Sequence, residues 1–214
     1  MTNTLRYKTT TFTLAALLTI LSAFQLFAQA DQTNTPTNAQ NVTVGAFTAK
    51  VPTDWKAFSA NDAVQLRREF MTQSQQIYMQ FSGADDPGKT VDMLAFHIAN
   101  GTGSFVLVSF TVPPTSNLIT LLKSQVNDKM AFGVREGYIR KYLGLVSVDS
   151  ERFSGFYTKV IGKSGAITLS GGLEHKSLRN TVIQLTLLSP GGWDEARATS
   201  TLSSILDSVA LRGK

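Results

Sequence analysis

Four runs of β-prone residues follow one another in the second half of the chain, separated only by short turns that contain Gly, Ser or Lys. The runs span 138–149, 153–161, 166–174 and 181–188. Strands joined by such short links pair with their neighbours in antiparallel fashion, because a parallel pair needs a long crossover. This block therefore predicts an antiparallel meander, which fixes most of the sheet.

Two further strand regions precede the meander. Residues 91–99 and 104–112 are apolar and β-prone, and the Asn100-Gly101-Thr102-Gly103 segment between them is typical of a hairpin connector. Earlier in the chain, VTVGAFTAKV from Val42 alternates as a single strand would, and Pro52 ends it by removing a backbone donor. Trp55 follows in a turn.

Apolar residues at helical spacing predict amphipathic helices beside these strands. The first helix is expected from Asn61 or Asp62 as its N-cap, with an apolar stripe that includes Leu66 and Phe70. The second is expected after Ser116 and runs toward Phe132, with Gly133 near its end.

A closing helix is expected from Trp193 to Val209, after the break at Pro190-Gly191-Gly192. Its buried side is predicted to consist of Ala196, Leu202, Ile205, Leu206 and Val209. Helices separated by strand runs, around a largely antiparallel sheet, predict an α+β fold, an α/β/α sandwich in which helices cover the sheet faces.

The first 30 residues have the three zones of a secretory signal peptide. Arg6 and Lys8 form a basic start, residues 12–27 are mostly apolar, and Ala28-Gln29-Ala30 offers the small residues of a cleavage site. We expect cleavage after Ala30 and a soluble protein in the periplasm or outside the cell. The alternative is an uncut anchor, for which the polar-interrupted apolar run is short.

The mature chain is expected to hold one domain. Residues 31–41 are almost free of apolar side chains and predict a disordered linker, which leaves 42–214 as the folded unit. The chain has no cysteine, which excludes a lipid anchor at the cleavage site, thiolate metal sites and dithiol redox chemistry. Its net charge of +5 loses two units with the signal, and its scattered basic residues do not predict nucleic acid binding.

His97 and His175 are the two histidines of the chain. His97 lies in an apolar strand and is expected in the core or on a sheet face, whereas His175 follows a strand end and is expected in a surface turn. Neither belongs to a metal-binding motif, so a metal role needs both to meet in space. The sequence indicates no catalytic, cofactor-binding or metal site.

Other polar or flexible motifs favour structural roles. Lys163-Ser164-Gly165 lacks an identifiable base, and Asp85-Asp86 lacks the spacing of a calcium loop. The Gly171-Gly172 and Gly191-Gly192 pairs are expected in turns, outside any phosphate-binding context. Trp55 and Trp193 are expected to be buried aromatic anchors.

The order of elements, the Pro52-Thr53-Asp54-Trp55 turn and the closing SSILDSVAL segment resemble one known superfamily. It groups the PsbP-like extrinsic proteins of photosystem II with the Ran-binding import factor and small exported bacterial proteins. The resemblance covers about residues 42–211. It implies an α/β/α fold and a non-catalytic module that binds a partner or assists an assembly, and it assigns no binding residue.

Two functions remain open from the sequence. The first is a binding or accessory module of the cell envelope, with an envelope protein or a small ligand as its partner and no stable membrane insertion after cleavage. The second is a secreted hydrolase whose site is assembled from distant residues, such as His97 or His175 with Ser or Asp neighbours. The oligomeric state is left open.

Overall fold

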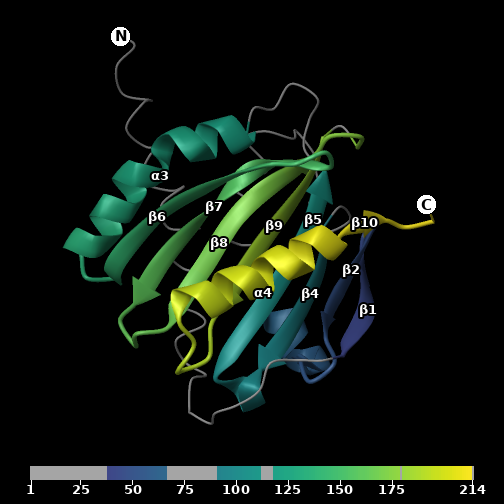
Figure 1. The fold of residues 1–214 in the computed structure, drawn as a ribbon, viewed down its shortest axis with the longest axis horizontal. Coiled ribbons are helices and arrows are strands. Elements are labelled where there is room, and N and C mark those ends of the chain that lie inside the picture. Colours follow the sequence, from purple (N-terminus) through teal and green to yellow (C-terminus); the bar gives the residue numbers. More distant parts are fainter. Residues whose placement is uncertain (1–37, 67–90, 112–117, 179, 214) are drawn as a thin grey trace.

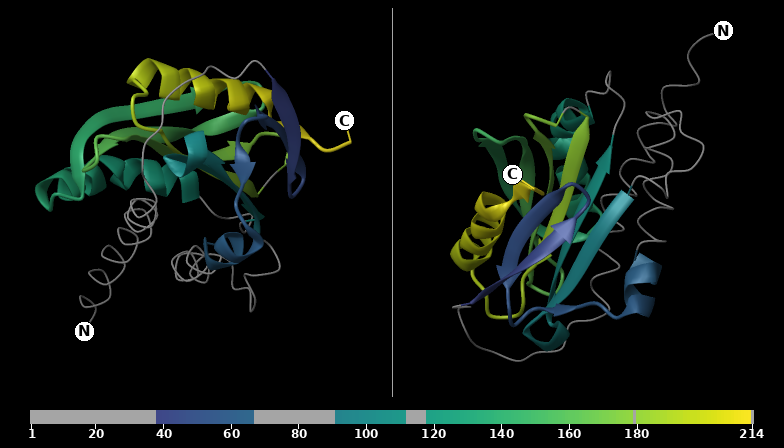
Figure 2. Two further views of the ribbon diagram at one scale, coloured as in Figure 1. Left: turned by 90° about the horizontal axis from the view of Figure 1, so that it is seen from below. Right: turned by 90° about the vertical axis from the view of Figure 1, so that its right-hand side faces the viewer.

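The chain folds into a sheet with helices on both faces. The computed structural model describes residues 38–66, 91–111, 118–178 and 180–213 (Figure 1). Helix α4 (Glu195–Ser208) covers one face of the main sheet and helix α3 (Leu118–Arg135) covers the other, as the view from below in Figure 2 shows. The predicted α+β class and sandwich layering are confirmed. The proposed cleavage site at Ala28 and Ala30, the Asp85-Asp86 pair and Ser116 lie outside the described residues.

The main sheet is antiparallel throughout and has the strand order β3-β4-β5-β9-β8-β7-β6. Its strands are β3 (Lys56–Ala57), β4 (Val91–Ile98), β5 (Gly103–Thr111), β6 (Ile139–Asp149), β7 (Phe153–Gly162), β8 (Ile167–His175) and β9 (Thr181–Leu188). The predicted meander is confirmed, because β6, β7, β8 and β9 are consecutive neighbours. The predicted hairpin is confirmed as β4 and β5, with the short helix η3 (Ala99–Gly101) at its connection.

The first predicted strand is wrong in detail, because it is a hairpin. Strands β1 (Ala39–Val44) and β2 (Phe47–Pro52) pair around a turn at Gly45, whose positive φ of 55° suits glycine. Strand β10 (Ala210–Leu211) pairs with the other edge of β2 to complete a small second sheet. Residues 39–41 of the predicted linker therefore belong to the folded unit.

The helix ends differ from the predictions in ways that hydrogen bonds explain. The helix that includes residues 60–66 is capped by Ser59 instead of Asn61 or Asp62, since Ser59 Oγ accepts from the backbone of Asp62 at 3.2 Å. Helix α3 passes Gly133 and ends at Arg135. The next turn places Gly137 at φ 71°, while Tyr138 N–H donates to the Gly133 carbonyl at 2.9 Å. This is a Schellman ending.

Helix α4 starts two residues later than expected. Asp194 is its N-cap, and its carboxylate accepts from the Arg197 amide at 2.8 Å. The buried side consists of Ala198, Leu202 and Ile205, so the prediction of Ala196 is wrong: that side chain is exposed. Trp55 is buried as predicted, and Trp193 packs partly buried against the same core cluster.

The Gly171-Gly172 pair lies inside β8 rather than in a turn, which corrects the sequence prediction. A Cβ on Gly171 would meet the Phe156 carbonyl oxygen at 2.1 Å, and a Cβ on Gly172 would meet Cδ1 of Ile119 at 2.8 Å. The first contact is with the neighbouring strand and the second is with α3. The two glycines therefore allow close packing on both sides of the strand, whereas Gly192 (φ 84°) does lie in a turn.

Candidate binding cleft

A cleft of about 470 Å³ opens at the end of the sheet where the short edge strand β3 meets the β4–β5 connection. It is lined by Asp54, Lys56, His97, Asn100 and Gly101. Asp54 comes from the turn after β2, Lys56 begins β3, and the others belong to β4 and η3. Two segments distant in sequence, 54–56 and 97–101, thus place a carboxylate, an ammonium, an imidazole and an amide around one opening.

The imidazole of His97 is held in place by an aromatic contact. Its ring stacks on Phe58 with centroids 4.0 Å apart and planes 11° apart. Phe58 is fixed in turn, because its amide donates to the Ala95 carbonyl at 3.0 Å. His97 is half-buried, so one side of the ring is covered while the side chain still reaches the cleft. The sequence prediction of a sheet-face histidine is confirmed.

The loop beside His97 is held in an unusual backbone shape. Ala99 and Asn100 have φ values of 47° and 56°, which side-chain-bearing residues rarely adopt, and Gly101 follows at 92°. Thr102 holds the loop, since its hydroxyl donates to the Ala99 carbonyl at 3.0 Å. At Gly103 the end of the loop packs closely against β9, because a Cβ there would lie 2.7 Å from the Leu188 carbonyl oxygen. The cleft wall is therefore shaped before any ligand arrives.

The serine that lies opposite His97 is not bonded to its imidazole. His97 lies directly across the β4–β5 pair from Ser104. Within the described residues, however, Ser104 Oγ is buried without a hydrogen-bond partner, so it is neither bonded to His97 nor open to a substrate. Among the described residues, the cleft therefore presents polar groups for binding and no hydrogen bond between His97 and Ser104.

His175 has a structural position, which corrects its predicted place in a surface turn. It is the last residue of β8 and is buried, with its ring 5.5 Å from Phe47 and edge-on to Phe153 at 5.0 Å. Its Nδ1 accepts the amides of Ser177 and Leu178, both at 3.1 Å. The ring thus caps the turn that follows β8.

The two histidines do not meet. His175 contacts the core on the α4 face, whereas His97 points to the opposite face, beside Ala95 in the β4 alternation. Over the described ranges, no group of three or more His, Asp or Glu side chains is arranged to hold a metal ion. The condition under which the sequence allowed a metal role, that both histidines come together, is therefore not met.

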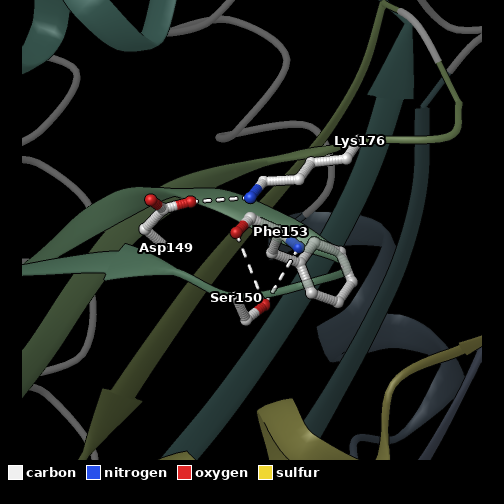
Figure 3. A network of polar contacts seen from close by, with 4 residues as sticks. All are labelled: Asp149, Ser150, Phe153 and Lys176. Atoms are coloured by element: carbon white, nitrogen blue, oxygen red, sulfur yellow. Dashed lines mark hydrogen bonds and ion pairs between the residues drawn. The ribbon is translucent and has the colours of Figure 1, made fainter.

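Polar contacts near His175 fasten the rim of the sheet (Figure 3). Lys176 Nζ contacts Asp149 Oδ1 at 2.7 Å, and this ammonium lowers the pKa of the Asp149 carboxyl. Ser150 Oγ accepts from the Phe153 amide at 3.0 Å, which closes the β6–β7 turn. Lys163-Ser164-Gly165 forms the next turn, where Ser164 Oγ accepts from Ala166 at 3.4 Å. These residues stabilise turns, as the sequence predicted for Lys163–Gly165.

One notable polar residue lies on α3, away from the cleft. Lys129 is buried with 6% of its surface exposed, and desolvation lowers the pKa of its ammonium from 10.5 to about 8. On β8, the same cause acts in the opposite direction: burial raises the pKa of the Glu174 carboxyl. Lys129 was not predicted as a notable residue, although its place between Val126 and Met130 on the apolar stripe was a usable signal.

The cleft was not predictable as a site from the sequence pattern. That pattern placed Asp54 and Asn100 in turns and His97 in a strand, but a hairpin connector of 100–103 would set Ala99 opposite Ser104. In the structure the connection starts earlier, and His97 is the residue opposite Ser104. The two-residue shift keeps each side chain on its face. The pairing of β3 with β4, which places Lys56 opposite His97, was not predicted.

Comparisons with known proteins found similarity in structure and none in sequence. No family model matches the chain, and no curated protein matches it in sequence. The chain is similar to a solved structure of a point mutant of the protein Mog1, with 13% sequence identity and a TM-score of 0.42. The match covers 82% of this chain and 96% of that chain. In the part of the chain that the structure describes, no helix has the length and apolar character needed to cross a bilayer.

Proposed function

We propose that this protein is a non-catalytic binding module that works outside the cytoplasm, and that the cleft of Asp54, Lys56, His97 and Asn100 takes its ligand. The observation that carries this function is the preformed cleft itself. Its imidazole is stacked on Phe58, and its loop is held by Thr102 and Gly103. Such preorganisation reduces the entropy lost on binding and does not require reaction chemistry.

The charges of the cleft suggest the class of ligand. Lys56 and Asp54 line the same opening and are both exposed, and in the described structure neither side chain forms an ion pair. A ligand with both an anionic and a cationic group would complement the two, and Asn100 offers both a donor and an acceptor beside them. A short peptide with free ends, or an amino acid, has this chemistry.

The binding test compares glycylglycine, which carries both charges, with its uncharged analogue N-acetylglycinamide. We expect glycylglycine to shift the amide NMR signals of residues 54–56 and 97–101, and the blocked analogue to bind at least about tenfold more weakly. Lys56→Gln should weaken glycylglycine binding, whereas Lys141→Gln, which removes an exposed lysine of β6, should not. Equal binding of both probes, or shifts elsewhere only, would contradict the assignment.

The competing hydrolase is tested with the same protein. His97→Phe keeps a ring to stack on Phe58 but removes both imidazole nitrogens. If the unmodified protein hydrolyses a panel of peptides and esters, and His97→Phe abolishes that activity while Lys141→Gln retains it, the cleft is catalytic. We expect no hydrolysis from any of the three proteins.

Export is tested separately. The signal of residues 1–30 predicts that the secreted product begins at Asp31. N-terminal sequencing of the protein from the periplasm or the culture medium checks this start. Accumulation of uncut, folded protein in the cytosol would contradict the proposed location while leaving the binding cleft untouched.

A further inference from the structure

The α3 face of the sheet has a polar strip where a buried face is usually apolar. Its members come from three adjacent strands and are all buried; they are Thr158, Thr168, Ser170 and Thr186, here called the hydroxyl strip. Ser170 Oγ and Thr186 Oγ1 lie 3.0 Å apart, and Thr158 donates to the Ser170 carbonyl at 3.0 Å. The strip separates two apolar clusters, one beneath α3 and one around Val106 and Val108.

Strand β8 shows why the strip is unusual. Its α4-facing positions are Ile167, Leu169 and Leu173, whereas the alternate positions are Thr168, Ser170, Gly172 and Glu174. This alternation is typical of a sheet with one face in water. Yet β8 lies between β7 and β9 in the interior of the sheet, and α3 contacts it. Helix α3 therefore covers a strand face whose composition is typical of a solvent-exposed surface.

Helix α3, which contacts β8, carries two unsatisfied polar groups. Among the described residues, Lys129 Nζ and Gln125 Oε1 are buried without a hydrogen-bond partner. They lie one turn apart on the same flank of the helix. The other flank faces β6, because Lys123 Nζ donates to Ser147 Oγ at 2.9 Å and Asn127 Oδ1 accepts from Tyr142 at 3.3 Å.

The helix period places the unsatisfied pair over the strip. At about 100° per residue, Lys129 and Gln125 each lie roughly 160° around the helix from Asn127. They therefore lie on the flank of α3 that is turned away from β6, the side of the helix on which β8 lies. The level along the sheet agrees, since Tyr142 opposite Asn127 is paired through Val160 to Thr168. Ser104 Oγ, also buried and unpartnered in the described chain, lies at the far end of the same row.

Buried polar atoms without partners are rare, and two on one flank of α3 indicate a missing polar occupant. Lys129 supplies donors and favours an anion, while Gln125 Oε1 needs a donor, and the strip hydroxyls can do either. We infer that the hydroxyl strip, Lys129 and Gln125 form an internal site for a small hydroxycarboxylate, with its carboxylate on Lys129 and its hydroxyl on Gln125. This site is separate from the cleft at His97 and does not depend on the proposed function.

The test uses two probes that differ in one hydroxyl group, glycolate and acetate. Calorimetric titration of the purified protein should show glycolate binding at least about tenfold more tightly than acetate. Lys129→Met should abolish binding of both, because no cation is left for the carboxylate. Gln125→Leu should retain acetate binding and lose the preference for glycolate.

Matched variants separate this site from the cleft and from general charge effects. Lys56→Gln in the cleft and Lys141→Met on β6 should both bind glycolate as the unmodified protein does. Amide NMR should place the glycolate-induced shifts at residues 125–130 and 168–170. Undetectable glycolate binding to the unmodified protein, or unchanged binding to a folded Lys129→Met variant, would overturn the inference.

Discussion

The two faces of the main sheet are built on different principles. The α4 face carries one continuous apolar cluster that extends from Phe47 of the small sheet to Leu202 of α4 and Tyr157 of β7. The α3 face carries two smaller clusters with the hydroxyl strip between them. One sheet can therefore have one apolar, tightly packed face and one face with polar groups, because side chains alternate along every strand.

The largest effect should come from removing the same side chain on each face. Leu202→Ala empties a fully buried position of α4 and should cost about 2–5 kcal/mol of unfolding free energy. Leu122→Ala on α3 removes a partly buried leucine and should cost ~1–2 kcal/mol. Denaturant unfolding of both variants measures the contrast. Equal losses would show that the two faces contribute alike.

The adjacent glycines of β8 sharpen the comparison at one point. Gly171→Ala would press against backbone atoms of β7 and should cost about 3 kcal/mol, whereas Gly172→Ala meets only the end of the Ile119 side chain and should cost about 1 kcal/mol. Gly191→Ala, which faces open space, serves as the control. Unfolding midpoints of the three variants check this order, and the reverse order for the first two would refute it.

A third prediction addresses the buried amine of the α3 face. Lys129→Met should stabilise the protein at pH 7 by ~1–3 kcal/mol, because it removes an unsatisfied buried donor. The folded-state pKa is about 8 against an ordinary 10.5, so the unfolded chain binds this proton more tightly. The free energy of unfolding of the unmodified protein should therefore rise between pH 8 and 10.5, because the Lys129 amine loses its proton in the folded state.

The pH dependence supplies its own control. Lys129→Met should lack that rise, whereas Lys141→Met, which alters an exposed lysine, should keep it. Thermal unfolding at pH 7, 8, 9 and 10 measures both variants. A destabilised Lys129→Met protein would mean that the amine has a favourable partner. The α3 face would then hold no unsatisfied amine at this position.

The smallest effect is expected at the sheet rim, which belongs to neither face. Lys176→Gln should raise the pKa of the Asp149 carboxyl toward its ordinary value, because the ammonium that lowers it is gone. Since Asp149 is fully exposed, the unfolding midpoint should stay nearly unchanged. A carboxyl NMR titration reads the pKa directly. No change in that pKa would show that the contact in Figure 3 is not kept in solution.

Most of the strands of the fold could be predicted from local sequence patterns. The meander and the β4–β5 hairpin were predictable because apolar alternation and turn residues agree with the final pairing. The β1–β2 hairpin was not, since Gly45-Ala46 interrupts the alternation too briefly to distinguish a turn from a continuous strand. The glycines of β8 were assigned to a turn. The reason that these positions require glycine, the close approach of Phe156 and Ile119, arises only from tertiary packing.

The candidate sites were less predictable, for a related reason. The cleft joins Asp54, His97 and Asn100 through strand register, which the hairpin pattern predicted two residues away from its actual position. Lys129 was visible as a charged residue within an apolar stripe. That α3 covers β8 was not predictable, because the polar alternation of this strand is typical of a sheet with one face in water.

The small sheet has a consequence for the order of folding events. Its central strand β2 is flanked by β1, from the start of the folded unit, and by β10, from the last residues of the chain. Arg212 N–H also donates to the Ala46 carbonyl at 2.8 Å. A chain that emerges from its N-terminus, from a ribosome or through a membrane pore, cannot complete this sheet until residues 210–211 have emerged. A copy cut short after Ser208 would leave one edge of β2 without its partner.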